Sequence, residues 1–255
     1  MDVEVIAALL CVAFAAGWVD AVVGGGGLIQ FPALLLALPN APIATALGTN
    51  KLVAITGTTA AAVSYARRTS VDWRTVGRAA ALAVPCSAAG ALIASELPAD
   101  VFRPAIMVVL LGVALFVTLR PAFGRSAREG TASRGRLYAA AALAGGGIGF
   151  YDGVLGAGTG TFLIITFVAL LGADFVGGSA MAKWVNLGTN AGALLVFAVQ
   201  GHVLWLLGLG MACCNVAGGT VGARVALSRG AGFVRGVLLV VVLLILVKLG
   251  HDQWG

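Results

Sequence analysis

Hydrophobic residues form long runs that are separated by short stretches rich in glycine, proline and charge. Most of these runs are long enough to cross a hydrocarbon core, which needs about 20 helical residues. The segment after the first glycines is only about 16 Å long as a helix, so we expect a half-helix there. No alternation of period two appears, which favours helices over barrel strands. The pattern predicts five segments in the first half: Val5 to Val23, Leu28 to Leu38, Ile43 to Tyr65, Thr75 to Ser95 and Arg103 to Leu119.

The chain contains an internal repeat. The stretch GWVDAVVGGGG, from Gly17, matches GFYDGVLGAGTG, from Gly149. At an offset of 132 residues Asp20 aligns with Asp152, Lys51 with Lys183 and Trp73 with Trp205. Chance readily aligns alanines and leucines in apolar sequence but not Asp, Lys and Trp together, so we infer a duplication. We expect a first membrane repeat over 1–119, a basic cytoplasmic linker over 120–136 and a second repeat over 137–255.

Basic loops predict the orientation of the segments. The loop Arg67 to Arg74 and the linker Arg120 to Arg136 should be cytoplasmic, and Glu96 to Arg103 should lie outside. In the second half the basic loop is Ser228 to Arg235, whereas the turn Gln200 to His202 carries no formal charge. Five segments per repeat would invert the second repeat. The predicted fold is an all-α polytopic membrane protein of two inverted-topology repeats, each with about four full transmembrane helices and a half-helix after a glycine-rich break.

Composition excludes an ordinary soluble domain. The chain is 60% hydrophobic and only 10% charged. Its net charge of +6 comes mainly from arginines in short loops, where it sets topology, so no nucleic-acid partner is expected. The four cysteines lack the spacing of metal ligands, and no cofactor or metal is expected. Asp2 and Glu4 stand where a secretory signal would be basic, so the first segment is expected to be retained as a span.

Four ionisable residues lie deep in apolar segments, and they form two repeat-related sets: Asp20 with Lys51, and Asp152 with Lys183. A charge at the bilayer centre costs at least about 2.5–3.5 kcal/mol, so such residues usually face a partner or a wet cavity. We expect the two lysines to present positive charge to one central cavity, with the aspartates holding them or carrying a coupling proton. In the alternative, each lysine only neutralises the aspartate of its own repeat.

The glycine breaks indicate an anion site. Consecutive glycines leave backbone N–H groups bare, and each break precedes a short helix whose N-terminus carries partial positive charge. Close helix packing is the alternative role of these glycines, and helix bridging is that of the asparagines. Gln30 has no polar counterpart in the second half. The candidate binding residues are Lys51, Lys183, Gly24, Gly25, Gly26, Gly27, Gly156, Gly158, Thr159, Gly160, Asn50, Asn186 and Asn190.

Several motifs resemble a known family. The spacing Asp-x-x-x-Gly-x-Gly from Asp20, the sequence ALGTNK ending at Lys51, and the second copies GFYDGVLGAGTGTFL and NLGTN resemble the sulfite exporter TauE/SafE family, and more closely its YfcA-like members. The resemblance runs from about Gly17 to Leu246. It implies a multi-pass permease of the bacterial cytoplasmic membrane, in a family where several members export sulfite or small organosulfur anions such as sulfoacetate. It does not supply the substrate of this chain.

Residues and resemblance agree on an anion carrier. We predict a secondary transporter, an exporter, that moves a small anion such as sulfite or an organosulfonate by alternating access. The expected partners are that anion and the lipid bilayer, and the sequence leaves a homo-oligomer open. An anion channel with the glycines as its filter is one alternative. An intramembrane enzyme is another, although no span offers a paired-His metal site, a Ser/His couple or H-E-x-x-H.

Overall fold

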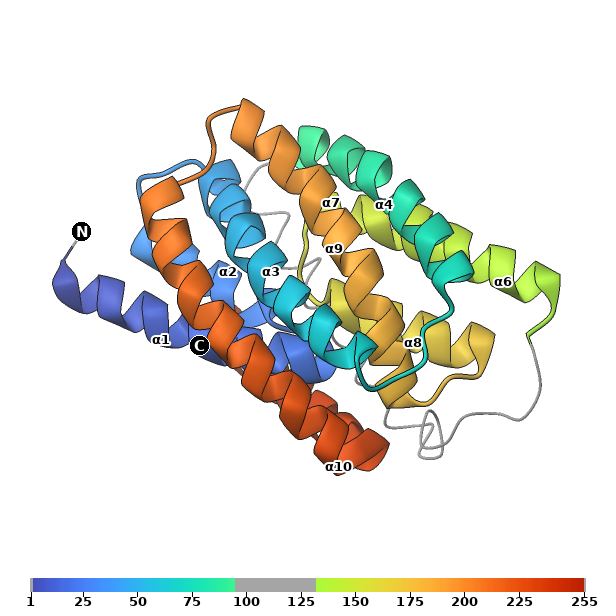
Figure 1. Cartoon of the computed structure of the whole chain (residues 1–255). Helices are drawn as coiled ribbons and strands as arrows, with labels where there is room; N and C mark the ends of the chain where they lie inside the picture. The colour runs from blue at the N-terminus through green and yellow to red at the C-terminus, as the bar shows by residue number, and fades with distance from the viewer. Residues whose placement is uncertain (1, 95–131, 255) are drawn as a thin grey trace.

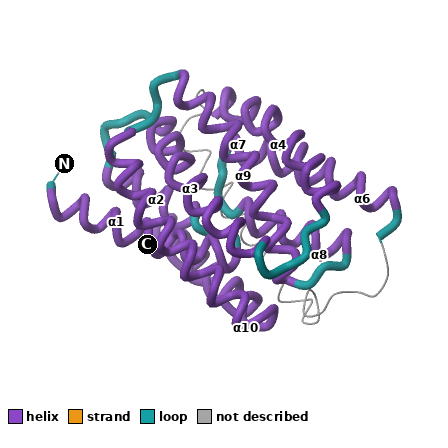
Figure 2. Tube along the Cα trace, viewed as in Figure 1, coloured by secondary structure: helices purple, strands orange, loops and turns teal. Residues whose placement is uncertain are grey.

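The computed structural model describes residues 2–94 and 132–254, and these ranges contain helices and loops but no strand (Figure 2). The four segments predicted for the first half within these ranges are confirmed, with no end shifted by more than two residues. The predicted span Arg103 to Leu119, the loop Glu96 to Arg103 and the linker up to residue 131 lie outside the described residues. The elements are α1 (Val3–Val23), α2 (Gly27–Ala37), α3 (Ile43–Ala66), α4 (Trp73–Ala94), α6 (Arg134–Ala141), the π-helix η1 (Ala142–Gly147), α7 (Ile148–Val154), α8 (Thr159–Leu171), α9 (Phe175–Val199) and α10 (Trp205–Trp254).

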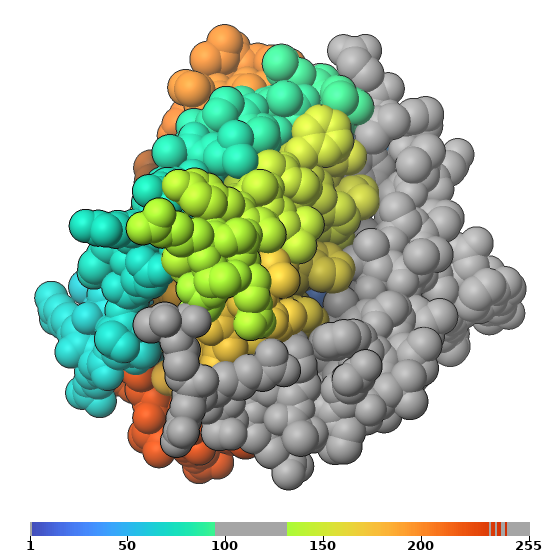
Figure 3. Space-filling view, turned by 90° about the vertical axis from the view of Figure 1, so that its right-hand side faces the viewer, coloured from blue at the N-terminus to red at the C-terminus, as the bar shows by residue number. Residues whose placement is uncertain are grey.

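The two central helices are α3 and α9, which pack against each other (Figure 1). On one side α10 packs along α3 and α1 packs along α10; on the other side α4 packs along α9, and α7 with η1 packs along α4. The short helices α2 and α8 fill the space beside α3 and α9 respectively. In the side view of Figure 3, α4 and α6 lie next to each other at the surface of the molecule.

The position of α3 and α9 follows from their composition. By length and hydropathy, three of the described helical segments could span a membrane: Val3–Val23, Trp73–Ala94 and Trp205–Val234. These flank the central pair, whereas α3 and α9 carry buried polar side chains that include Lys51 and Lys183. Polar groups in a bilayer are tolerated where neighbouring helices shield them from lipid. The apolar helices on both flanks provide this shielding.

The two predicted helix breaks are confirmed. Helix α1 ends at Val23 and Gly24 follows with a φ of 77°. In the second half, Gly156 and Gly158 have φ values of 66° and 76°, and α8 begins at Thr159. Positive φ is strained for residues with a Cβ, which explains why glycine occupies these three positions. Each break redirects the chain into a short helix.

Two features differ from the sequence-based expectation. The loop predicted over Ser228 to Arg235 is wrong: α10 is helical on both sides of Gly230, whose φ of 74° and ψ of −172° make a kink. One glycine in this conformation turns the chain without a longer loop. The π-helix Ala142–Gly147 was not predicted; it contains Gly145, which lies against the backbone of Ala79.

Candidate functional site

The two helix breaks contact each other through their backbones. A Cβ built on Gly24 would lie 2.3 Å from the carbonyl carbon of Gly160, and one built on Gly160 would lie 2.4 Å from the Cα of Gly24. Likewise, a Cβ on Gly27 would lie 3.0 Å from the carbonyl oxygen of Gly156. No side chain fits between Gly24 and Gly160, so these glycines allow a close backbone crossing at the centre of the molecule.

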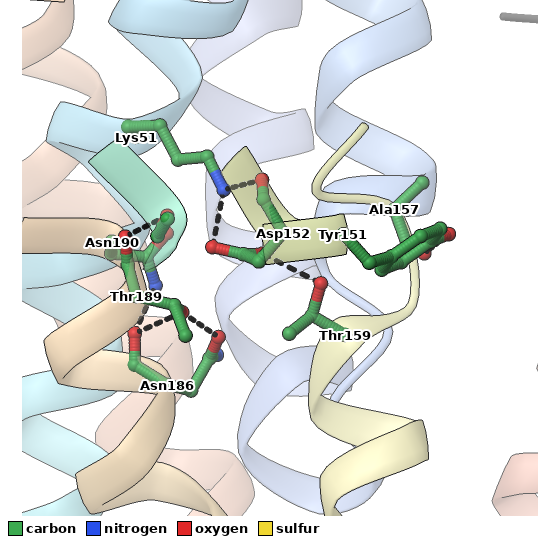
Figure 4. Close-up of polar contacts among 9 residues, drawn as sticks. Lys51, Tyr151, Asp152, Ala157, Thr159, Asn186, Thr189 and Asn190 are labelled. Atoms are coloured by element: carbon green, nitrogen blue, oxygen red, sulfur yellow. Dashed lines mark hydrogen bonds and ion pairs between the residues drawn. The ribbon is translucent and has the colours of Figure 1, made fainter. Parts of the chain in front are cut away.

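A cavity of about 20 Å³ lies at this crossing. It brings together most of the predicted site residues, from α1, α2, α3, α7, α8, α9 and both breaks. Figure 4 shows Asn186 and Asn190 on one side of this region and Asp152 with Thr159 on the other. Lys51, Lys183, Gly25, Gly26 and Gly158 are not among its lining residues. The lining is Asp20, Gly24, Gly27, Asn50, Ala54, Asp152, Gly156, Thr159, Gly160, Asn186 and Asn190.

Both lysines form ion pairs with aspartates of the opposite half. Lys51 Nζ lies 2.6 Å from Asp152 Oδ2, and Lys183 Nζ lies 2.9 Å from Asp20 Oδ2. The side chains of the two lysines are 1% and 0% exposed. Each lysine therefore neutralises an aspartate, as the alternative interpretation expects, but the predicted partner is wrong, because the pairs run between the halves and not within one repeat. A repeat offset shows which residues are equivalent, but not which ones meet.

The same lysines also bind the ends of the interrupted helices. Lys51 Nζ donates to the main-chain oxygen of Asp152 at 2.7 Å, and Lys183 Nζ donates to that of Asp20. These oxygens lie near the C-termini of α7 and α1, where partial negative charge collects. At the end of α1, Tyr65 Oη also donates to the Ala21 oxygen at 3.0 Å, and Thr161 Oγ1 to the Val23 oxygen at 2.8 Å. Side chains thus satisfy the negative ends of the broken helices.

The positive ends of the short helices remain available. Gly27 is the first residue of α2, and Thr159 and Gly160 are the first two of α8; all three line the cavity. In the described part of the chain, no acceptor is bound to the backbone N–H groups of these three residues. Unpaired N–H groups at a helix N-terminus form a binding site for anions. The cavity therefore receives the partial positive charge of two helices.

The two halves of the site are not identical. Asp152 is 2% exposed and also accepts from Thr159 Oγ1 at 2.6 Å, whereas Asp20 is 16% exposed and accepts from Thr58 Oγ1 at 3.2 Å. Asn186 occupies the repeat position of Ala54, so that α9 offers an amide where α3 offers a methyl group. The formal charges of the two lysines and two aspartates cancel. The four side chains together therefore bring no net charge to the cavity, and what its lining offers a ligand is directed hydrogen-bond donors.

Sequence reasoning assigned no role to two residues that support the site. Gln30 donates to Asn50 Oδ1 at 2.8 Å, and Asn215 Nδ2 donates to Gln30 Oε1 at 3.2 Å. Asn215 could have been noticed as a lone amide within an apolar run, the usual sign of a buried polar contact in a membrane helix. Its repeat position holds Ala83, so the comparison of the halves did not reveal it. Across residues 2–94 and 132–254, no group of three or more His, Cys, Asp or Glu could hold a metal ion.

Comparison with known proteins identifies the family. The model of the sulfite exporter TauE/SafE family matches residues 9–249. The chain belongs to this family. Several relatives match this chain over nearly their whole length. The probable membrane transporter protein ORF9 of Sinorhizobium is 36% identical over 98% of this chain and 94% of its own.

Two further relatives have similar names. The probable membrane transporter protein YfcA of Escherichia coli K12 is 34% identical over 97% of this chain and 90% of its own. A probable membrane transporter protein of Haemophilus influenzae is 31% identical over 99% of this chain and 97% of its own. No solved structure is significantly similar to the chain. The family resemblance inferred from the glycine and Asp/Lys motifs is confirmed, and the relatives are named as membrane transporters.

Proposed function

We propose that this protein is a secondary transporter that moves a small anion across the bacterial cytoplasmic membrane. Two inverted halves would form the anion site and expose it to each side of the membrane in turn, by alternating access. The observation that carries the proposal is the central cavity, where two interrupted helices from different halves direct unpaired N–H groups toward one point. Membership of a transporter family supports it.

Reciprocal contacts support a two-fold relation between the halves. Lys51 binds Asp152, and exchange of each residue for its repeat equivalent gives the other pair, Lys183 with Asp20. Helix packing follows the same rule, since α1 packs along α10 while α7 with η1 packs along α4. Contacts that survive this exchange are expected of two copies related by a pseudo-two-fold axis. An odd number of segments per copy would place that axis in the membrane plane.

Hydrogen-bond donors favour an anion as ligand. The first N–H groups of α2 and α8 and the amides of Asn50 and Asn186 surround the cavity. Both carboxylates at the cavity are bound by lysines, so the charges of the aspartates are compensated. A proton on Asp20 or Asp152 would leave one lysine charge uncompensated and would strengthen anion binding. This gives a physical basis for coupling anion transport to a proton.

The small size of the cavity favours alternating access. A volume of about 20 Å³ accommodates roughly one water molecule. A sulfur oxyanion is several times larger, so it enters only if the halves separate at the contact between Gly24 and Gly160. Because the ion pairs link the halves, they would open and re-form as the site turns from one face of the membrane to the other. An open channel would not need this movement.

The substrate class follows from the family description, which is that of a sulfite exporter. We propose sulfite or an organosulfonate as substrate, and export as the direction. Purified protein in proteoliposomes is tested with ³⁵S-labelled sulfite, sulfoacetate and thiosulfate, with protein-free liposomes as control. We expect saturable flux of at least one anion, abolished in the Gly160→Ala variant, whose Cβ cannot fit against Gly24. Equal flux of all three anions with and without protein would refute the proposal.

A further inference from the structure

Three buried amide side chains form a chain of hydrogen bonds from α10 to the cavity. Asn215 on α10 is 3% exposed, Gln30 on α2 is 1% exposed and Asn50 on α3 is 4% exposed. Asn215 Nδ2 donates to the main-chain oxygen of Ala13 at 2.8 Å and to Gln30 Oε1 at 3.2 Å. Gln30 Nε2 then donates to Asn50 Oδ1 at 2.8 Å and to the main-chain oxygen of Asn50 at 3.4 Å. We call these three residues the amide relay.

The direction of the amide relay is fixed at both ends. A main-chain oxygen can only accept, so Asn215 must turn its NH₂ group toward Ala13. With that NH₂ group also facing Gln30, Gln30 must present its own oxygen there and its NH₂ group to Asn50. The main-chain oxygen of Asn50 imposes the same orientation on Gln30. Asn50 consequently turns its side-chain oxygen to Gln30 and its NH₂ group away from it.

The NH₂ group of Asn50 lies beside the N-terminus of α2. A Cβ built on Gly27 would be 3.8 Å from Asn50 Nδ2, and both residues line the cavity. Among the described residues, no acceptor is bound to Asn50 Nδ2. The nitrogen thus adds a directed donor to the unpaired N–H group of Gly27. An oxygen atom of a ligand in the cavity could accept from both.

The second half lacks the amide relay. By the repeat offset of 132 residues, Gln30 corresponds to Phe162, Asn50 to Ala182 and Asn215 to Ala83. The second half nevertheless forms equivalent helices. The relay is therefore not required to build these helices, and its cost, the burial of three amides, needs another explanation. Orientation of a ligand-binding group provides one.

We infer that Asn50 binds an oxygen atom of the transported anion through its side-chain NH₂ group, and that Gln30 and Asn215 are positioning residues that hold this group toward the cavity. The inference rests on the proposed function. The transported anion then carries an unprotonated oxygen atom. This oxygen binds on the side of the cavity that the first half of the chain forms. The lysines act behind the aspartates, whereas Asn50 contacts the anion.

A double-mutant cycle tests the relay. Asn50→Ala removes the donor and should raise the KM for the transported sulfur anion by at least about tenfold. Gln30→Met keeps the length and neutrality of the side chain but frees the Asn50 amide. If the freed Asn50 amide spends equal time in two orientations, the KM of Gln30→Met should rise about twofold. If the donor is lost completely, the KM should rise about tenfold. In the Asn50→Ala background, Gln30→Met should have no further effect on KM.

The control is Ser179→Ala, which removes a buried hydroxyl that bonds to Phe175 within α9. It should leave the KM unchanged, and thermal unfolding in detergent checks that every variant is folded. An effect of Gln30→Met of equal size with and without Asn50 would overturn the inference, because Gln30 would then act independently. If the parent carries sulfite, sulfoacetate or thiosulfate but Asn50→Ala has the parental KM, the inference alone fails. If the parent carries none of them, the proposed function fails and the inference with it.

Discussion

Neutralising Asp152 alone should destabilise the protein more than neutralising it together with Lys51. In the Asp152→Asn variant, the Lys51 ammonium stays buried at 1% exposure without the carboxylate that lies 2.6 Å from it. Loss of one partner from a buried ion pair typically costs about 3–5 kcal/mol. For a chain of this size, about 2–4 °C of thermal midpoint corresponds to 1 kcal/mol. The midpoint should therefore fall by about 6–20 °C.

The double variant Lys51→Met with Asp152→Asn should recover most of this loss. It removes the uncompensated charge and loses only the hydrogen bonds from Lys51 to the side chain and the main-chain oxygen of Asp152, so we expect a net cost of about 1–2 kcal/mol. The mismatched double variant, Lys51→Met with Asp20→Asn, leaves Asp152 and Lys183 each unpaired. Its costs should add to about 6–10 kcal/mol and yield no folded protein.

Thermal unfolding of each purified variant in detergent, followed by loss of monodispersity, measures these differences. The matched and mismatched double variants have the same composition of charges, so they differ only in which partners remain. Rescue of Lys51→Met by Asp20→Asn instead of Asp152→Asn would refute the pairing between halves. A midpoint shift below about 2 °C for Asp152→Asn would refute the energetic reasoning.

Two further substitutions test the packing around the helix breaks. Gly24→Ala places a Cβ 2.3 Å from Gly160 at a φ of 77°, so overpacking and backbone strain should together cost about 2–5 kcal/mol. In Gly25→Ala the nearest contact of the Cβ would be at 3.6 Å, so this variant should unfold like the parent. Equal midpoints for the two variants would contradict the close crossing. Tyr65→Phe removes the hydrogen bond to Ala21 and should cost about 1 kcal/mol in the same assay. Tyr138→Phe, at a residue that is 59% exposed, should leave the midpoint unchanged. An equal effect of the two substitutions would show that the Tyr65 hydroxyl does not support the end of α1.

Most of the fold could be predicted because hydropathy and glycine act locally. The runs of apolar residues predict the four described helices of the first half to within two residues, and the glycines after Val23 mark the first break. The π-helix at Ala142–Gly147 could not be predicted, because its extra residue per turn leaves no distinct hydrophobic period over six residues. Charged residues cluster near Gly230, so the sequence predicts a loop where the structure has only a kink.

The candidate site could be predicted as a set of residues but not as a set of contacts. Repetition singled out Asp20, Lys51, Asp152 and Lys183, since charges deep in apolar segments seldom coincide by chance. It could not show that each lysine crosses to the other half, because partner choice depends on how the halves pack. The amide relay could not be predicted for a related reason. Gln30 and Asn215 have no polar equivalents in the other repeat, so only their contact in the folded structure reveals them.

Counterflow of the transported anion tests the central claim most directly. Proteoliposomes are loaded with excess unlabelled anion, either sulfite or sulfoacetate, and diluted into a trace of the same anion labelled with ³⁵S. A carrier whose site faces one side at a time should accumulate label transiently above its equilibrium level, with a rate that saturates and depends on anion in the lumen. If the label only equilibrates, and its rate neither saturates nor depends on the anion in the lumen, the protein is a channel. This result would contradict alternating access.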